Sequence, residues 1–235
     1  MSTNLKYIGN ELNLFAKASQ WKCYLRAEID RFVSGSVLEV GAGLGTTTRA
    51  LWKPAVKHWV CVEPDAELCL TLQQNLSQWS LHCDLKTGTI ESVPAGDGFD
   101  CILYVDVLEH IEYASHELEL AQARLRTGGY LVVLAPAHQW LYTPFDQAGG
   151  HYRRYSRSQL LAIAPRHLRV VKARYLDSVG LLATLGNRMF LRRSIPTVGQ
   201  IRVWDSVLVP LSRTVDRLFC NSIGKSVLCV WRREQ

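Results

Sequence analysis

Three glycines within five residues follow a short apolar run near the start of the chain. The run covers residues 37–40, and the sequence Gly-Ala-Gly-Leu-Gly occupies 41–45. Glycine lets the backbone turn sharply and approach a ligand closely, where a Cβ would collide. Twenty residues beyond Gly43, Glu63 ends a second apolar run. An acidic side chain there can accept hydrogen bonds from both hydroxyls of a ribose, so the two features predict a nucleoside-binding site.

Apolar runs of strand length alternate with amphipathic segments along most of the chain. The predicted strands cover residues 37–40, 58–62, 81–85, 99–104, 130–134, 168–175 and 225–232. The predicted helices cover residues 11–33, 46–52, 65–76 and 114–125, and Gly128 and Gly129 are expected to close the last of these as a C-cap. Strands and helices that alternate through short turns predict a parallel sheet covered on both faces.

The alternation stops after the strand at 130–134. Residues 135–157 form a long, aromatic, turn-rich segment, of a length that usually serves binding. Residues 176–224 are predicted to be helical and to form a lid between the last two strands. Within them, the segment 181–191, with Arg188, Arg192 and Arg193 nearby, could contact a membrane surface, and a plain packed helix is the alternative.

The spacing of the glycines favours one class of nucleoside site. Thr46 stands where the dinucleotide fingerprint needs its third glycine, which disfavours a nicotinamide-dependent oxidoreductase. The pattern Gly-x-Gly-x-Gly, with Glu39 two residues before it, instead resembles motif I of class I S-adenosylmethionine-dependent methyltransferases. Glu63 resembles their ribose-binding motif, and residues 99–111 and 125–129 resemble the motifs around their fourth strand and before their fifth.

This resemblance covers residues 36–134 and implies a Rossmann-like α/β fold. The expected architecture is a doubly wound, mostly parallel, seven-stranded sheet with helices on both faces. We expect a single domain over residues 1–235, with a helical cap at 1–35, a cofactor-binding core at 36–134 and an acceptor side at 135–235. The implied cofactor is S-adenosylmethionine, and its product is S-adenosylhomocysteine.

The resemblance also assigns cofactor contacts residue by residue. The assigned residues are Glu39, Gly41, Gly43, Gly45, Glu63, Pro64, Thr89, Ile90, Asp106, Val107 and Lys22. Glu39 and the glycines are expected to hold the methionine part of the cofactor, and Glu63 the ribose. Pro64 and the pair Thr89-Ile90 are expected on opposite sides of the adenine, although the family often has an acid where Thr89 stands.

Two of these assignments leave alternatives open. Asp106 and Val107 should line the floor near the methyl group, but Asp106 could equally be a helix N-cap. Lys22 could pair with the methionine carboxylate, or it could be a surface residue.

Residues 135–157 should open beside the cofactor, because loops after parallel strands lie at the carboxyl edge of the sheet. The stretch from Pro144 to Ser156 resembles one found in a subgroup of these methyltransferases, which gives no acceptor. The candidate acceptor-binding residues are His110, His138, Trp140, Tyr142, Arg153 and Arg154. The arginines could clamp a carboxylate or phosphate, and a packed, hydrogen-bonded His110 is equally compatible with the sequence.

Methyl transfer from a sulfonium is an in-line displacement, so the protein chiefly aligns the nucleophile with the methyl group. A base helps when the acceptor must lose a proton. His151 is the first candidate base, because the ordinary pKa of histidine suits proton acceptance near neutrality, and Tyr155 is the second. The alternative is that these groups order the loop. No metal ligands are assigned from the sequence.

The charge of the chain is divided unevenly. Residues 1–150 carry 11 Lys and Arg against 17 Asp and Glu, whereas residues 151–235 carry 16 against 4, so the two parts have net charges of −6 and +12. A basic C-terminal third could face an anionic acceptor, a membrane surface or nucleic acid, or it could be a solvated basic face that balances an acidic one. No RNA-binding module is visible, so nucleic acid is the less favoured partner.

Seven cysteines without a C-x-x-C pair indicate a reduced, cytoplasmic protein. No signal peptide or transmembrane run is recognised, although peripheral membrane contact is compatible with the sequence. A monomer and a homodimer are equally compatible with it. The leading hypothesis is methyl transfer to an O or N atom of a small molecule, either a secondary metabolite or heterocycle, or a glycan or lipid-linked sugar. A nucleic-acid methyltransferase and a catalytically inactive cofactor-binding protein are the alternatives.

Overall fold

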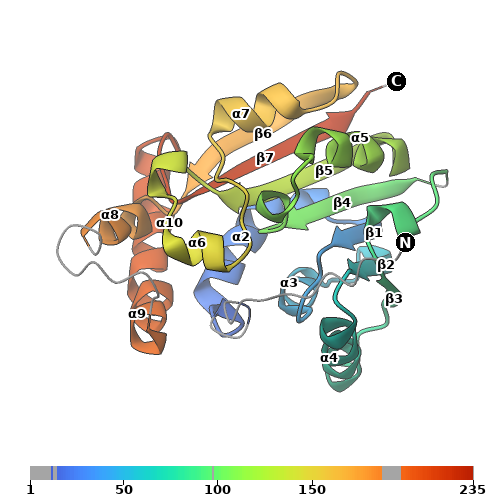
Figure 1. Cartoon of the computed structure of the whole chain (residues 1–235), viewed down its shortest axis with the longest axis horizontal. Coiled ribbons are helices and arrows are strands. Elements are labelled where there is room, and N and C mark those ends of the chain that lie inside the picture. Colours follow the sequence, from blue (N-terminus) through green and yellow to red (C-terminus); the bar gives the residue numbers. More distant parts are fainter. Residues whose placement is uncertain (1–11, 13–14, 97, 187–196, 235) are drawn as a thin grey trace.

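The computed structural model describes residues 12, 15–96, 98–186 and 197–234 and is built around one seven-stranded sheet (Figure 1). The strand order is β3-β2-β1-β4-β5-β7-β6. The strands are β1 (Gly35–Val40), β2 (Val56–Glu63), β3 (Asp84–Thr87), β4 (Phe99–Val105), β5 (Leu125–Pro136), β6 (Leu168–Leu176) and β7 (Ser226–Arg233). Strands β1 to β5 pair in parallel, and β7 runs antiparallel between β5 and β6. The predicted doubly wound, mostly parallel sheet is confirmed.

Helices cover both faces of this sheet. They are α2 (Ser19–Ile29), α3 (Thr46–Leu51), α4 (Ala66–Gln78), α5 (Ala114–Arg124), α6 (Pro144–Ala148), α7 (Arg157–Ile163), α8 (Ser178–Gly186), α9 (Val198–Val203) and α10 (Val209–Leu218). Figure 1 shows α5 and α7 together on one face. Two short 3-10 helices, η2 (Ile90–Ser92) and η3 (Leu108–His110), join that face, and residues 204–208 form a π-helix that connects α9 to α10.

Each face of the sheet has its own apolar core, because side chains alternate along a strand. On β4, Ile102 and Tyr104 point into the core under α5, while Cys101 and Leu103 point into the core under α2 and α10. All four are fully buried. A central parallel strand therefore has no solvent-facing side, which explains why its sequence is continuously apolar.

Two predicted elements have different bounds in the structure. The first helix was predicted over residues 11–33; residues 11, 13 and 14 lie outside the described residues, Leu12 and Phe15 are helical, and α2 itself begins at Ser19 and gives way to a 3-10 turn after Ile29. The third strand lies at 84–87, later than the predicted 81–85. At residues 30–33 and 81–83 the apolar pattern extends beyond the residues with regular helix or strand geometry.

The prediction of a glycine C-cap after α5 is wrong. α5 ends at Arg124 and its C-cap, Leu125, is already extended, so that Gly128 and Gly129 lie inside β5. A Cβ on Gly129 would lie 2.9 Å from the carbonyl oxygen of Phe99 on β4. These glycines therefore permit close strand pairing and do not stop a helix.

Buried carboxylates fasten the C-terminal helices to α2. Asp205 accepts hydrogen bonds from the backbone N–H groups of Gln20 and Trp21 at 3.2 and 2.9 Å, which caps the start of α2 from another element. Asp216 on α10 accepts a hydrogen bond from the Tyr24 hydroxyl at 2.7 Å. The helices predicted within residues 176–224 are confirmed for the described part of that range. The contacts of Asp205 and Asp216 hold these helices against α2.

The predicted membrane-contacting segment is described only in part. Residues 181–186 belong to α8, where Leu181 is buried and Leu182 is exposed. Arg188, Arg192 and Arg193 lie outside the described residues. No helix in the described ranges is both long and apolar enough to cross a bilayer.

Gly45 offers a test of the bend between β1 and α3. Its φ is +75°, and a Cβ there would lie 2.5 Å from Cδ1 of the fully buried Leu72. We expect Gly45→Ala to lower the free energy of unfolding by about 2–4 kcal/mol, through backbone strain and overpacking. The measurement is urea unfolding. The matched control is Gly199→Ala in α9, where no contact is closer than 3.9 Å and stability should not fall. Equal stability of both variants would contradict the expectation.

Candidate functional site

The carboxyl ends of β1, β2 and β4 meet at one edge of the sheet, and the glycine loop crosses this edge. Gly41, Gly43 and Gly45 have φ values of +68°, +53° and +75°. A Cβ on Gly41 would lie 2.6 Å from a methyl group of Val107, whereas one on Gly43 would meet only Leu12, at 3.3 Å, among the described residues. Among the described residues, the space beside Gly43 is therefore closed only at Leu12, as expected where a ligand approaches the backbone.

Glu63 links the end of β2 to this loop. Its carboxylate accepts hydrogen bonds from the N–H of Gly43 at 2.8 Å and from the N–H of Asp65 at 3.1 Å. Burial raises the pKa of Glu63, and these two hydrogen bonds oppose the shift. The structure thus brings the predicted ribose-binding acid into contact with the predicted cofactor loop.

Glu39 lies beneath the loop. It is 2% exposed, and its Oε2 accepts hydrogen bonds from the Thr48 hydroxyl at 2.6 Å and from the Trp59 indole at 3.1 Å. Burial raises the pKa of Glu39 to about 7. These contacts fix α3 and β2 against β1, so the described role of Glu39 is to support the loop, and its contact with a cofactor remains a prediction.

Asp106 follows β4 at the same edge, with a φ of +55°. Asp106 is exposed, and it interacts electrostatically with His151, Lys225, Arg154 and Lys22. The alternative that Asp106 caps a helix is not seen, because the N-cap of η3 is Val107 and no side chain caps it. Asp106 is thus an acid that faces four basic groups.

The three residues predicted to contact the adenine differ in their exposure. Gly88 donates its N–H to the carbonyl of Glu63 at 2.9 Å, so the turn that follows β3 lies beside the end of β2. Thr89 is exposed and Pro64 is half-buried there. Ile90 is fully buried in the core under α5, so its side chain does not line an open site.

Lys22 on α2 reaches the same edge from below. Its Nζ donates hydrogen bonds to the carbonyls of Phe15 and Ala16 at 3.0 and 2.9 Å. Burial lowers its pKa, and the carboxylates of Asp205 and Asp106 oppose this shift. Lys22 is therefore a partly enclosed cation beside Asp106, and the idea that it pairs with the methionine carboxylate remains a prediction.

Asp146 organises the loop that follows β5. Its carboxylate accepts hydrogen bonds from the N–H and hydroxyl of Thr143, from His151 Nδ1 at 3.1 Å and from Arg154 Nε at 2.9 Å. Burial would raise the pKa of Asp146, but these partners together lower it to about 2. An ionised Asp146 holds Nδ1 of His151 as the proton-bearing nitrogen, which leaves the other ring nitrogen as the acceptor.

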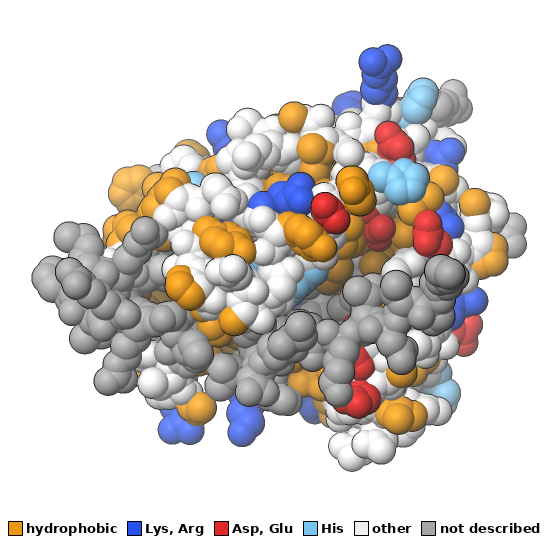
Figure 2. Space-filling view, in the orientation of Figure 1, with side chains coloured by type: hydrophobic (Ala, Val, Ile, Leu, Met, Phe, Trp, Pro, Cys, Tyr) orange, Lys and Arg blue, Asp and Glu red, His pale blue; other side chains and the backbone are white. Residues whose placement is uncertain are grey.

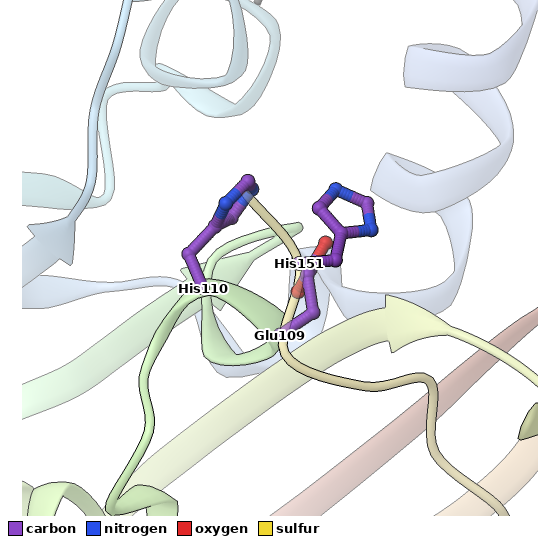
Figure 3. Close-up of side chains that lie close together, drawn as sticks. All are labelled: Glu109, His110 and His151. Atoms are coloured by element: carbon purple, nitrogen blue, oxygen red, sulfur yellow. The ribbon is translucent and has the colours of Figure 1, made fainter. Parts of the chain in front are cut away.

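His151 lies against residues of η3. Its ring meets the ring of His110 edge-on, with centroids 4.5 Å apart. The N–H of Tyr152 donates to the carbonyl of Glu109 at 2.8 Å, and the Tyr142 hydroxyl donates to the carbonyl of His151 at 2.6 Å. These bonds draw the loop after β5 onto the turn after β4, and Figure 3 shows the resulting group of side chains.

Two other predicted residues of this loop are part of its framework. Tyr155 is 3% exposed, its hydroxyl donates to the carbonyl of Leu108 at 3.1 Å, and burial raises its pKa to about 12. This placement argues against Tyr155 as a base, because a buried phenol of high pKa stays protonated. Arg154 is buried and forms an ion pair with Asp146 at 2.8 Å, so it orders the loop and does not present an anion clamp.

The remaining acceptor candidates contact other segments. Arg153 donates to the carbonyl of Glu112 at 2.8 Å. His138 stacks on Tyr175 with ring centroids 4.9 Å apart and lies beside Trp140, which is 51% exposed. The structure therefore brings together His110, Tyr142 and His151, whereas Arg153 contacts Glu112 and His138 contacts Tyr175.

Sequence reasoning missed several residues at this edge. Lys225 directly precedes β7, its Nζ lies 4.9 Å from the centroid of the Trp204 ring, and it interacts electrostatically with Asp177 and Asp106. Asp146 and Glu109 were also missed as site residues. Lys225 is about 120 residues from Asp106 along the chain, so no local pattern could have found it, whereas Asp146 could have been suspected from the polar composition of its loop.

The buried carboxyl of Glu39 gives a stability prediction. Its pKa is about 7 in the folded chain against an ordinary 4.5, so ionisation destabilises the fold progressively between these pH values and fully above pH 7. Glu39→Gln does not ionise. The stability of the variant relative to the parent should therefore increase by about 3 kcal/mol between pH 4 and pH 8, at 1.4 kcal/mol per pKa unit. Urea unfolding across this range measures it, and a difference that is constant with pH would contradict it.

Solved structures of methyltransferases share this fold. A S-adenosylmethionine-dependent methyltransferase from Clostridium acetobutylicum has 11% identity and a TM-score of 0.60, with 93% of each chain covered. The N-methyltransferase NodS from Bradyrhizobium japonicum has 15% identity and a TM-score of 0.59, with 94% of this chain and 97% of that chain covered. NodS has also been solved with S-adenosylhomocysteine.

A further solved structure, the mitomycin 7-O-methyltransferase MmcR, has 13% identity and a TM-score of 0.58, and the match covers 94% of this chain and 54% of that one. No curated protein matches the chain. A family model described as "Methyltransferase domain" matches residues 14–179, which include the glycine loop, Glu63, Asp106 and His151. The chain belongs to this family and is a class I S-adenosylmethionine-dependent methyltransferase.

Proposed function

We propose that the chain methylates an O or N atom of a small molecule, and that His151 accepts the proton of the acceptor. The observation that carries this proposal is the Asp146–His151 hydrogen bond at the carboxyl edge of the sheet, beside Asp106. A histidine oriented by a buried carboxylate is a common arrangement for a general base.

The residues present fit the cofactor of this class. Gly43 borders space that a Cβ would narrow, and the acid Glu63 lies within hydrogen-bonding distance of its N–H. Glu63 would hold the ribose hydroxyls, and the glycine loop and Lys22 would hold the methionine part. When bound, S-adenosylmethionine supplies a methyl group on a positively charged sulfur that is already activated for displacement.

The acceptor would lie between Asp106 and the loop after β5. There the acceptor O–H or N–H would donate to the unprotonated nitrogen of His151, which takes the proton as the acceptor atom gains its methyl group. Asp146 then stabilises the imidazolium, because it is ionised and bonded to Nδ1. Tyr142 and the backbone of Glu109 hold His151 in place for this step.

The comparisons support either acceptor atom. NodS is named as an N-methyltransferase and MmcR as a 7-O-methyltransferase, and this chain is similar to both in fold. Both sequence identities are low, so the choice between an O and an N acceptor atom in this chain has to come from identifying its acceptor.

The distribution of charge disfavours the nucleic-acid alternative. Lys172 and Arg174 are bonded to Glu28 at 3.0 and 3.2 Å, and Arg169 pairs with Glu234 at 2.7 Å, so part of the basic C-terminal third is neutralised within the chain. Among the described side chains on the face shown in Figure 2, the Lys and Arg side chains lie in separate places and form no continuous basic patch. We propose a cytoplasmic location, which all seven cysteines support, since each is a free thiol.

The predicted roles of Glu63 and Gly43 can be tested through cofactor binding. We expect Glu63→Ala and Gly43→Asp to weaken the binding of S-adenosylhomocysteine by at least about 10-fold, because a hydrogen bond to a charged group contributes about 1.5–3 kcal/mol. Isothermal titration calorimetry measures this, with Glu119→Gln on the exposed face of α5 as the control. Thermal unfolding checks that both variants are folded. Unchanged affinity in both variants would remove the basis of the cofactor assignment.

The proposed acceptor class and the role of His151 can be tested through methyl transfer. Purified protein with methyl-labelled cofactor should label phenols, heterocycles or amines from a small-molecule panel, and it should not label RNA or DNA. With the acceptor found, His151→Ala should lower the rate about 10²–10⁴-fold while the affinity for S-adenosylhomocysteine stays the same. His116→Ala, a change at an exposed histidine, is the control. Salt-sensitive labelling of nucleic acid would favour the alternative function instead.

A further inference from the structure

Glu109, His110 and His151 form a compact cluster at the carboxyl edge of the sheet (Figure 3). Glu109 and His110 come from η3, and His151 comes from the loop after β5. One carboxylate oxygen and one nitrogen from each ring lie within 4.8 Å of one another. In Figure 3 the carboxylate of Glu109 points toward the space between the two rings.

Glu109 carries a buried oxygen without a partner. The residue is 1% exposed, and its Oε2 has no hydrogen-bond partner within the part of the chain that the structure describes. The nearby cation Arg154 is already bonded to Asp146. A buried acid of this kind lacks a compensating positive charge.

Both histidines are held by their surroundings. Asp146 bonds Nδ1 of His151 at 3.1 Å, and backbone groups of Gly149 and Gly150 hydrogen-bond the ring of His110. In protein metal sites a ligating histidine usually donates its second N–H to a carboxylate or a backbone carbonyl, which fixes the ring and its tautomer. Besides its three ligand atoms, the cluster therefore has groups that hold the two histidine rings in place.

We propose that Glu109, His110 and His151 bind one divalent transition-metal ion. Two imidazole nitrogens and one carboxylate oxygen suit Zn²⁺, Mn²⁺, Fe²⁺ or Co²⁺, whereas Mg²⁺ and Ca²⁺ prefer oxygen ligands alone. A tetrahedral ion with bonds of about 2.1 Å holds its ligands about 3.4 Å apart. Movements of roughly an ångström would therefore bring the three ligand atoms onto the ion.

The ion would also favour an acceptor that carries a hydroxyl group, and this inference rests on the proposed function. Three protein ligands leave coordination positions for another oxygen, as in catalytic metal sites. The site lies beside Asp106, next to the glycine loop, so an acceptor hydroxyl bound to the ion would lie near the cofactor. Coordination would lower the pKa of that hydroxyl, and its proton would leave to water. Because the ion would occupy the nitrogen of His151 that otherwise accepts the proton, His151 would act as the base in the metal-free chain and the ion would take over this role in the metal-loaded chain.

The test is metal binding by the purified full chain, without cofactor or acceptor. The probe is Co²⁺, followed by its visible absorption and by calorimetry after removal of adventitious metal with a chelator. We expect one equivalent to bind. Glu109→Gln, His110→Ala and His151→Ala should each weaken binding at least about 100-fold, and Asp146→Asn about 10–100-fold, because it removes the outer-shell partner.

Matched controls separate this site from other surface ligands. His58→Ala and His116→Ala remove exposed histidines that pair with acids, and Cys23→Ser and Cys220→Ser remove exposed thiols. None of these should change the binding of the single equivalent. Glu109→Gln has a second signature: loss of an unpartnered buried carboxylate should raise the melting temperature of the metal-free chain, while Co²⁺ should stabilise the parent and not the variant.

Each outcome decides the proposal. Loss of the bound equivalent in the three ligand variants, with the controls unchanged, supports it. No binding to the parent, or binding that persists in all three ligand variants, overturns it. Affinity for S-adenosylhomocysteine is measured in the same preparations, so a chain that binds the ion but methylates no small molecule would refute the proposed function and leave the metal site standing.

Discussion

The site depends on the parallel pairing of β1 with both β2 and β4. Because parallel strands end at the same edge, this pairing brings the glycine loop, Glu63 and Asp106 together although they lie 20 to 65 residues apart. The pairing is enforced by burial, since strand side chains fill apolar cores on both faces of the sheet. The hydrogen bond from Gly43 to Glu63 then joins two of the three strand ends directly.

A second level of organisation comes from buried carboxylates, each bound by donors from other segments. Asp146 gathers the loop after β5 around His151 and Arg154, while Asp205 and Asp216 fasten the C-terminal helices to α2. A buried carboxylate is costly unless it is well hydrogen-bonded, so these acids specify one arrangement of otherwise irregular segments. Glu109 differs from these acids because its buried Oε2 has no hydrogen-bond partner among the described residues. This difference separates the proposed metal ligand from the carboxylates that hold segments together.

Local sequence patterns predicted the features that are contiguous in the chain. The glycine bend, the apolar strands and the position of Glu63 follow from backbone sterics and from burial on both strand faces, and each is found near its predicted place. Patterns failed where a residue serves a distant partner. Gly129 has the appearance of a helix stop but allows β5 to approach Phe99, and Tyr155 has the appearance of a base but is bonded to the carbonyl of Leu108.

The sequence by itself therefore determined the fold class and, through its resemblance to known motifs, the methyltransferase family, because these depend on short-range periodicity and spacing. Only the tertiary structure decided which side chains meet at the acceptor side. His151 lies more than 40 residues from Glu109, and Lys225 about 120 from Asp106, yet all four belong to one edge. The physical reason is that long-range contacts follow from the packing of the whole chain, and no local pattern of residues records them.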